Sequence, residues 1–226
     1  MSIVDNSALL HLLHLVSPAL PVGAYAYSQG LESAVDQAWV QDLNSAEHWM
    51  RATMSTNLAY LDAPVLLRLY AAWEDNNLKD VKKWNQFLQA SRESSELLLE
   101  DIQMGEALLR LLKDLKIQKA LDWKLEKNTS YATTFALAAS HWKIDPQQTL
   151  QGFLWSWLEN QVAAAIKLIP LGQTQGQHLL VNIISDIGKV AEIATQLKDD
   201  QLGWSLPRVA MASMQHEAQY SRLFRS

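Results

Sequence analysis

The sequence contains no cysteine, so disulfide bonds, thiolate metal sites and cysteine nucleophiles are all excluded. Turn-forming residues are also scarce, since eight glycines and six prolines are few for 226 residues and β-rich domains normally use more. Basic side chains do not predominate either, and the net charge of −5 argues against the basic stripe of a nucleic-acid-binding surface. These absences point away from a disulfide scaffold, a β-rich fold and a nucleic-acid partner.

Long apolar runs are missing as well. None approaches the ~20 residues that a membrane-spanning helix needs, so we expect no membrane association. Residues 1–6 contain no lysine or arginine of the kind that a secretory signal carries, which favours a cytoplasmic location. Apolar residues nevertheless make up 49% of the chain, which is enough to bury a substantial core. We therefore expect a soluble, cytoplasmic globular protein.

The clearest helical periodicity lies between residues 97 and 112. One helical face is formed by residues that recur every three or four positions, namely Leu98, Ile102, Gly105, Leu109 and Leu112. A second stripe beside it consists of Leu97, Met104, Leu108 and Leu111. Glycine inside a helix costs ~1 kcal/mol against alanine, so Gly105 indicates close approach by another element. We expect Leu109 to be buried.

End signals divide the rest of the chain into further helices. Candidate N-caps are Asn6 or Ser7 for the first helix and Asn44 or Ser45 for the third. Helices restart where an aspartate closely precedes a proline, at Asp62 and at Asp145. The apolar helix over 65–73 is expected to be central, and Pro207 begins the final helix.

Two segments interrupt this pattern. Residues 113–127 are charged and irregular and are interpreted as a solvated connection, before an alanine-rich helix over 129–142. Residues 171–177 break a long helix, and they lack the lysine and the glycine spacing of a phosphate loop, which excludes nucleotide binding. No segment alternates as a half-buried strand does. The sequence predicts a single all-α domain over 1–226, a bundle of about nine or ten helices with a mobile N-terminus.

Residues 17–32 are the most distinctive segment of the chain, and their sequence is SPALPVGAYAYSQGLE. Two prolines three positions apart remove backbone donors and hold the chain extended, and Gly23 permits a backbone conformation closed to other residues. The aromatic residues that follow do not continue the apolar face of a neighbouring helix, so we do not expect helix packing to bury them. Such aromatic loops are typical of contact sites, so we expect this segment to bind a partner.

Histidines are the candidate metal ligands and acid–base residues of this sequence. His11 and His14 have a spacing that can bring two imidazoles to one helical face, as a metal site requires, but they lie among leucines with no third ligand nearby. Packing between helices is the interpretation that we favour for them. His216 and Glu217 offer an acid–base pair, although adjacent residues point to different helical faces. A capping or surface role remains open for both.

Four blocks of the sequence, in order, resemble the urease accessory protein UreF family. They are residues 17–32, residues 92–105, the stretch from Trp155 to Gln177, and the ending HEAQYSRLFRS at 216–226. Together they span nearly the whole chain. Residues 113–128 match no pattern of the family.

The resemblance implies a function and a set of partners. Proteins of this family are all-helical, homodimeric accessory factors in the nickel loading of urease. They bind an accessory protein of the UreD or UreH type and recruit the GTPase UreG, and the assembly delivers nickel to apo-urease. The resemblance implies an adaptor or chaperone rather than an enzyme, with no catalytic residue, no metal ligand and no cofactor of its own. A helical metal-binding hydrolase that uses His216, Glu217 and the Gly23 loop remains the alternative.

The motif positions also provide candidate partner-binding residues. The resemblance implies this role most directly for Tyr25 and Arg222. The full set that matches the motifs is Tyr25, Ser28, Glu32, Gln173, Gln177, His216, Tyr220 and Arg222. For Glu32, Gln173, Gln177 and His216, capping or holding loops in shape is an open alternative. We expect the segment over 220–226 to be mobile and to become ordered on a partner, because chain ends leave the fold at little cost.

Overall fold

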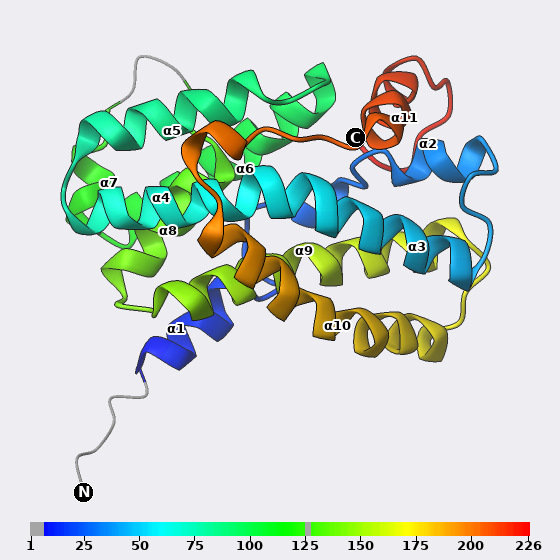
Figure 1. Ribbon diagram of the computed structural model, residues 1–226, viewed down its shortest axis with the longest axis horizontal. Coiled ribbons are helices and arrows are strands. Elements are labelled where there is room, and N and C mark those ends of the chain that lie inside the picture. The colour runs from blue at the N-terminus through cyan, green and yellow to red at the C-terminus, as the bar shows by residue number, and fades with distance from the viewer. Residues whose placement is uncertain (1–6, 125–127) are drawn as a thin grey trace, which may run out of the picture.

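The computed structural model describes residues 7–124 and 128–226, and within these ranges the fold is all-α with no strand (Figure 1). This confirms the predicted fold class. The α-helices are α1 Ser7–Leu15, α2 Leu31–Asp36, α3 Leu43–Thr53, α4 Ala63–Glu74, α5 Leu78–Ala90, α6 Ser95–Asp114, α7 Gln118–Asp122, α8 Tyr131–His141, α9 Pro146–Leu168, α10 Gln173–Gln196 and α11 Pro207–Glu217. Short 3-10 turns are η1 Ala24–Ala26 and η3 Asp199–Gln201, and η2 Met54–Asp62 is a π-helix. The predicted mobile N-terminus and the candidate cap Asn6 lie outside the described residues.

Helices α3 and α4 form one continuous rod with the π-helical η2 between them. Thr53, Met54, Asp62 and Ala63 all keep right-handed helical dihedral angles, so the backbone does not break at either junction. The sequence predicted a restart at Asp62, yet its side chain caps nothing. It instead accepts hydrogen bonds from the largely buried Arg92, and Pro64 occupies one of the first two positions of α4.

The core is centred on α8, which packs against α4 and α6. Residues 132–140 are all buried, and α4 buries most of its length, as expected for the 65–73 segment. A Cβ atom at Gly105 would clash with the backbone of Thr129 and Ser130, which explains the glycine in the middle of α6. Leu109 is buried beside it, as predicted.

Two local predictions are wrong for identifiable reasons. The cap of α3 is Asp42 rather than Asn44 or Ser45, because Asp42 accepts from the Ser45 amide and the Ser45 hydroxyl completes a capping box. Within the predicted solvated connection over 113–127, the described residues 113–124 contain α7 and bury Ile117, Ala120 and Trp123, so this part is packed against the core. Residues 125–127 of that segment lie outside the described part of the chain.

Helices α9 and α10 form an antiparallel pair along one side of the molecule (Figure 1). Asp145 accepts from the amides of Gln147 and Gln148 and so caps α9 as predicted. The predicted break is shorter than expected, because α10 already begins at Gln173. No helix in the described ranges is both long and apolar enough to span a membrane.

Candidate functional site

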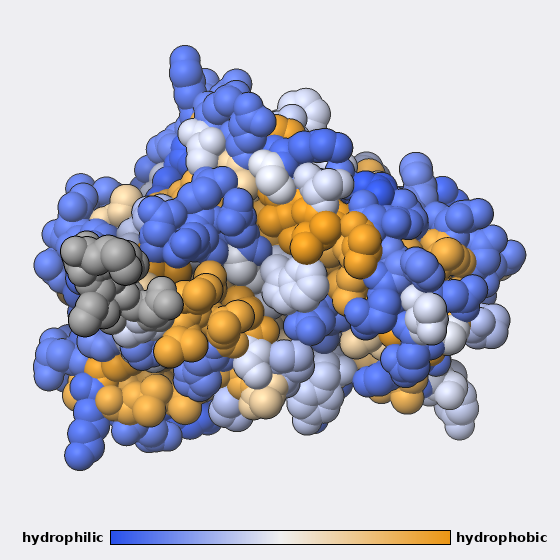
Figure 2. Space-filling model, turned by 90° about the horizontal axis from the view of Figure 1, so that it is seen from below, coloured by the Kyte–Doolittle hydropathy of each residue, from blue (hydrophilic) through white to orange (hydrophobic). Residues whose placement is uncertain are grey.

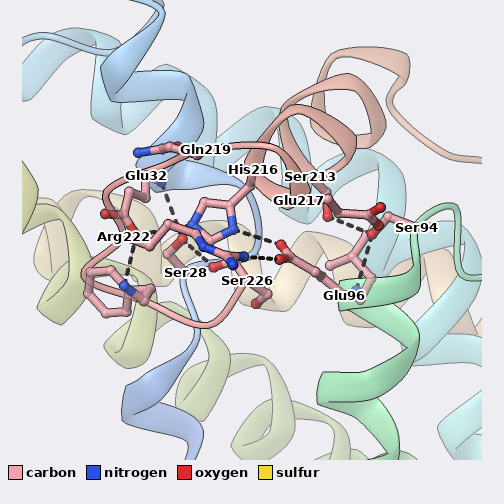
Figure 3. Close-up of polar contacts among 12 residues, drawn as sticks. Ser28, Glu32, Ser94, Glu96, Ser213, His216, Glu217, Gln219, Arg222 and Ser226 are labelled. Atoms are coloured by element: carbon pink, nitrogen blue, oxygen red, sulfur yellow. Dashed lines mark hydrogen bonds and ion pairs between the residues drawn. The ribbon is translucent and has the colours of Figure 1, made fainter.

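The last residues of the chain fold back into the molecule and are held by Glu32 (Figure 3). Glu32 lies in the first turn of α2 and is buried. Its carboxylate accepts the backbone N–H of Leu223 at 2.6 Å and that of Phe224 at 2.8 Å. The Phe224 side chain is itself buried. Glu32 therefore anchors the backbone of residues 223–224 to α2.

His216, at the end of α11, connects Glu32 of α2 to Glu96 of α6. Its Nε2 lies 3.1 Å from a Glu32 oxygen and its Nδ1 lies 2.7 Å from Glu96 Oε2. An ionised carboxylate only accepts hydrogen bonds, so the fully buried ring satisfies both partners when each nitrogen carries a proton. Arg222 Nη1 donates to the second oxygen of Glu96 at 2.6 Å. Glu96 is therefore shared by His216 and Arg222, while Glu32 is shared by His216 and the tail backbone.

The final two residues pair with the aromatic loop. The carbonyl oxygen of Ser226 accepts the backbone N–H of Ser28 at 2.8 Å and its hydroxyl at 2.5 Å. The backbone N–H of Arg225 donates to the carbonyl of Ala26 at 2.8 Å, and the Ser226 hydroxyl donates to Glu100 at 2.8 Å. The expectation of a mobile C-terminal segment therefore differs from this structure, because side chains of α2 and α6 satisfy the segment's backbone and polar groups.

His216 and Glu217 do not form an acid–base pair. His216 faces the two carboxylates of α2 and α6, whereas Glu217 accepts the amide of Ser95 at 2.9 Å and its hydroxyl at 2.7 Å (Figure 3). Glu217 thus helps to cap α6, beside its N-cap Ser94. Both residues serve as structural contacts here, and the geometry of the hydrolase alternative is not formed.

The two histidines of α1 also have a structural partner. His11 stacks on Trp142 with ring centroids 4.9 Å apart and planes 6° apart, and His14 meets the same ring edge-on at 6.0 Å. Within residues 7–124 and 128–226, three or more His, Asp or Glu side chains nowhere gather closely enough to hold a metal ion. The packing interpretation fits the placement of this pair.

A cavity of about 390 Å³ lies beneath the loop over residues 17–25. Its walls come from η2, α6, α9 and α10 and are mostly apolar. Among the residues that line it are Tyr25, Gln29, Glu93, Glu100, Gln173 and Gln177. The structure therefore brings Tyr25, Gln173 and Gln177 together around one cavity, whereas Ser28, Glu32, His216 and Arg222 belong to the neighbouring cluster that holds the tail.

Glu100 connects the cavity to the tail. Its Oε1 accepts from Gln29 at 2.7 Å and its Oε2 accepts from Ser226. Burial raises the pKa of Glu100 to about 7, although the hydrogen bonds from Gln29 and Ser226 oppose that rise. Gln29 in turn accepts the indole N–H of Trp157 at 2.6 Å. A chain of hydrogen bonds thus runs from the tail to the cavity wall.

The motif residues differ in exposure. The side chains of Tyr25 and Tyr220 are exposed, and so are those of Gln173 and Gln177. Ser28, Glu32 and His216 are buried and cannot touch a partner directly in this conformation. Glu96, Glu100 and Gln29 were missed by the sequence-based site prediction, although they lie inside or beside the motif blocks. Their positions within those blocks were the available signal.

The fold and the site together define an all-α protein that holds its own C-terminal segment beside a loop that lines a surface-accessible cavity. A family model described as UreF matches residues 40–184. The urease accessory protein UreF of Teredinibacter turnerae is 53% identical over 221 residues, which cover 98% of this chain and 100% of that protein. Those of Hahella chejuensis and Alkalilimnicola ehrlichii are 47% and 45% identical, covering 97% and 95% of this chain and 98% and 94% of those proteins. The chain belongs to the UreF family of urease accessory proteins.

Proposed function

We propose that this chain is a non-enzymatic adaptor in the nickel loading of urease. It joins an accessory protein of the UreD or UreH type to the GTPase UreG, and the assembly delivers nickel to apo-urease in the cytoplasm. The observation that carries the proposal is near full-length identity of 43–53% to proteins named urease accessory protein UreF. The adaptor needs no catalytic residue and no cofactor of its own.

The partner-binding surface that we propose is the outer side of the docked tail, formed by Tyr220, Arg222 and Leu223 and called the tail surface below. Leu223 is 64% exposed and Tyr220 is fully exposed. Tyrosine and arginine are the residues most often found at binding hot spots. An exposed leucine beside them supplies apolar area for an interface. Glu32 and His216 act from beneath, as positioning residues for this surface.

Co-purification tests the surface. Wild type and variants are co-expressed with the UreD/UreH-type partner and UreG, and captured partner is quantified beside urease activation and a melting curve. We expect Leu223→Ala and Arg222→Ala to lose most of the captured partner while the isolated protein stays folded. Leu115→Ala is the matched control, because Leu115 is also an exposed leucine and lies at the far end of α6 from Glu96. Full capture by both tail variants would refute the assignment.

We also propose a homodimer. The face seen in Figure 2 carries apolar patches among hydrophilic side chains. Exposed apolar residues of α1 and α10 are Leu9, Leu10, Leu13, Val181 and Ile184. Exposed apolar patches mark contact surfaces in soluble proteins. Light scattering after gel filtration should give twice the chain mass of 25.5 kDa, and a monomer at all concentrations would refute the dimer.

A further inference from the structure

The cavity beneath residues 17–25 has the size and wall of a ligand site. Its volume of about 390 Å³ falls within the range of ~300–1,000 Å³ that small-molecule sites occupy. Apolar side chains dominate its lining, including Leu20, Met104 and Phe153. An aliphatic chain would gain contacts with these walls on entering.

The charges around the cavity are strongly one-sided. Its lining contains five carboxyl groups, of Asp62, Glu93, Glu100, Asp101 and Glu159, against one guanidinium, of Arg92. Arg92 is shared by two of them, lying 2.7 Å from Asp62 and 3.4 Å from Asp101. Of the remaining acids, Glu100 is only partly ionised near neutral pH because burial raises its pKa to about 7, whereas Glu93 and Glu159 have no ion-pair partner in the described structure. The cavity therefore favours a positively charged guest.

Glu93 is the acid that most needs a partner. Its Oε1 is buried and accepts no hydrogen bond. A buried carboxylate oxygen without a donor costs free energy that a bound cation would recover. Glu93 also lines the cavity, so the missing donor can arrive from within it.

We propose that the cavity receives an aliphatic ammonium group, the lysine side chain of a partner protein, with its ammonium on Glu93 and its stem along the apolar wall. This inference rests on the proposed adaptor function, because it assigns part of the partner's contact. Lysine fits better than a bare metal ion, since three metal ligands do not converge in the described residues and the walls are apolar. Lysine fits better than arginine, because the compact ammonium can use the single carboxylate oxygen without a planar fork of acceptors.

Isolated protein and small probes test the chemistry. Calorimetric titration compares n-hexylammonium with 1-hexanol and hexanoate, which share its stem and differ in head group. We expect hexylammonium to bind at least about tenfold more tightly than either, since a hydrogen bond to a charged group is worth about 1.5–3 kcal/mol. Glu93→Gln should abolish this preference. It should also remain folded, because Glu93 Oε1 has no partner to lose.

A charge-matched control variant and the outcomes that contradict the proposal complete the titration. Glu192→Gln makes the same charge change on the exposed side of α10 and should bind hexylammonium as wild type does. Equal binding of 1-hexanol and hexylammonium, or unchanged binding by Glu93→Gln, would overturn the assignment. Competition by Ni²⁺ that needs Glu93 would replace the ammonium with a metal ion and overturn it as well.

The partner is tested last. Saturating hexylammonium should reduce capture of the UreD/UreH-type protein or of UreG by wild type, and Glu93→Gln should reduce capture without the probe. If wild type captures its partners and neither treatment changes this, the lysine site is wrong and the adaptor function stands. If wild type captures no partner while hexylammonium still binds at Glu93, the adaptor function fails and only the chemistry of the site survives.

Discussion

Replacing Glu32 by glutamine should release the C-terminal segment without unfolding the bundle. Glu32 accepts the backbone N–H groups of Leu223 and Phe224 and faces Nε2 of His216. Glutamine has the same shape but only one oxygen, and its amide nitrogen is a donor. At least one of these three donors would then face another donor inside the protein.

The size of the effect follows from those contacts. A hydrogen bond to a charged group contributes about 1.5–3 kcal/mol, and an unsatisfied buried donor costs a similar amount. We expect the docked state of the tail to lose about 3 kcal/mol relative to the released state, which is about a 100-fold rise in the released population. The main core around α8 lies away from this contact, so global unfolding should change little.

Hydrogen exchange of the backbone amides measures this population directly. The amides of Leu223 and Phe224 should exchange about 100-fold faster in Glu32→Gln than in wild type, because the docked state is destabilised by about 3 kcal/mol. Glu217→Gln is the matched control, because Glu217 also accepts a backbone amide, that of Ser95. It should accelerate exchange at Ser95 and leave the tail protected. Unchanged exchange at the tail in Glu32→Gln, with a response at Ser95 in the control, would show that Glu32 does not hold the tail.

Three other side chains give four further predictions. Because burial raises the pKa of Glu100 from 4.5 to about 7, the folded state binds its proton more tightly than the unfolded state. The free energy of unfolding should therefore fall by about 3 kcal/mol as pH rises from 4.5 to 7, and denaturant melts of Glu100→Gln should lack this component. Leu109→Ala should cost ~2–5 kcal/mol, and a loss below ~1 kcal/mol in denaturant melts would contradict its burial. Arg222→Ala should lower the free energy of unfolding by less than about 1 kcal/mol, since the Arg222 side chain is 39% exposed and Glu96 retains its hydrogen bond with His216. Arg222→Lys should restore partner capture only in part, because it keeps the charge and loses the planar fork, and full rescue in a pull-down would argue against that geometry.

The helices could be predicted from the sequence because their signals are local. The stripes around Leu109 and the Asp145–Pro146 start depend only on neighbouring residues. The junction at Asp62 could not be predicted in this way, because its side chain is engaged by Arg92, thirty positions along the chain. A start signal does not show whether the preceding helix has ended. The α7 region was missed for another reason, since alternating charges hid the spacing of Ile117, Ala120 and Trp123.

The site was predicted only as a set of residues. Motif positions identified Glu32 and His216, but no local pattern indicates that a carboxylate in α2 and an imidazole 184 positions later are hydrogen-bonded. Their burial follows from the packing of α11 on α2, which a single sequence does not reveal. The cavity could not be predicted either, because its walls come from segments spread along nearly the whole chain.

The opening motif and the chain's last residues form one structural unit, and Gly30 explains how they meet. Its φ of +79° is a conformation that side chains disfavour, and a Cβ there would lie 3.0 Å from the amide nitrogen of Ser213 in α11. A bare backbone at this point lets α11 approach α2 and brings His216 to Glu32. From there the hydrogen bonds run through Ser226 and Glu100 toward the cavity. One chain of hydrogen bonds thus joins the tail surface to the cavity wall, so we expect a partner bound to the tail surface to influence binding in the cavity.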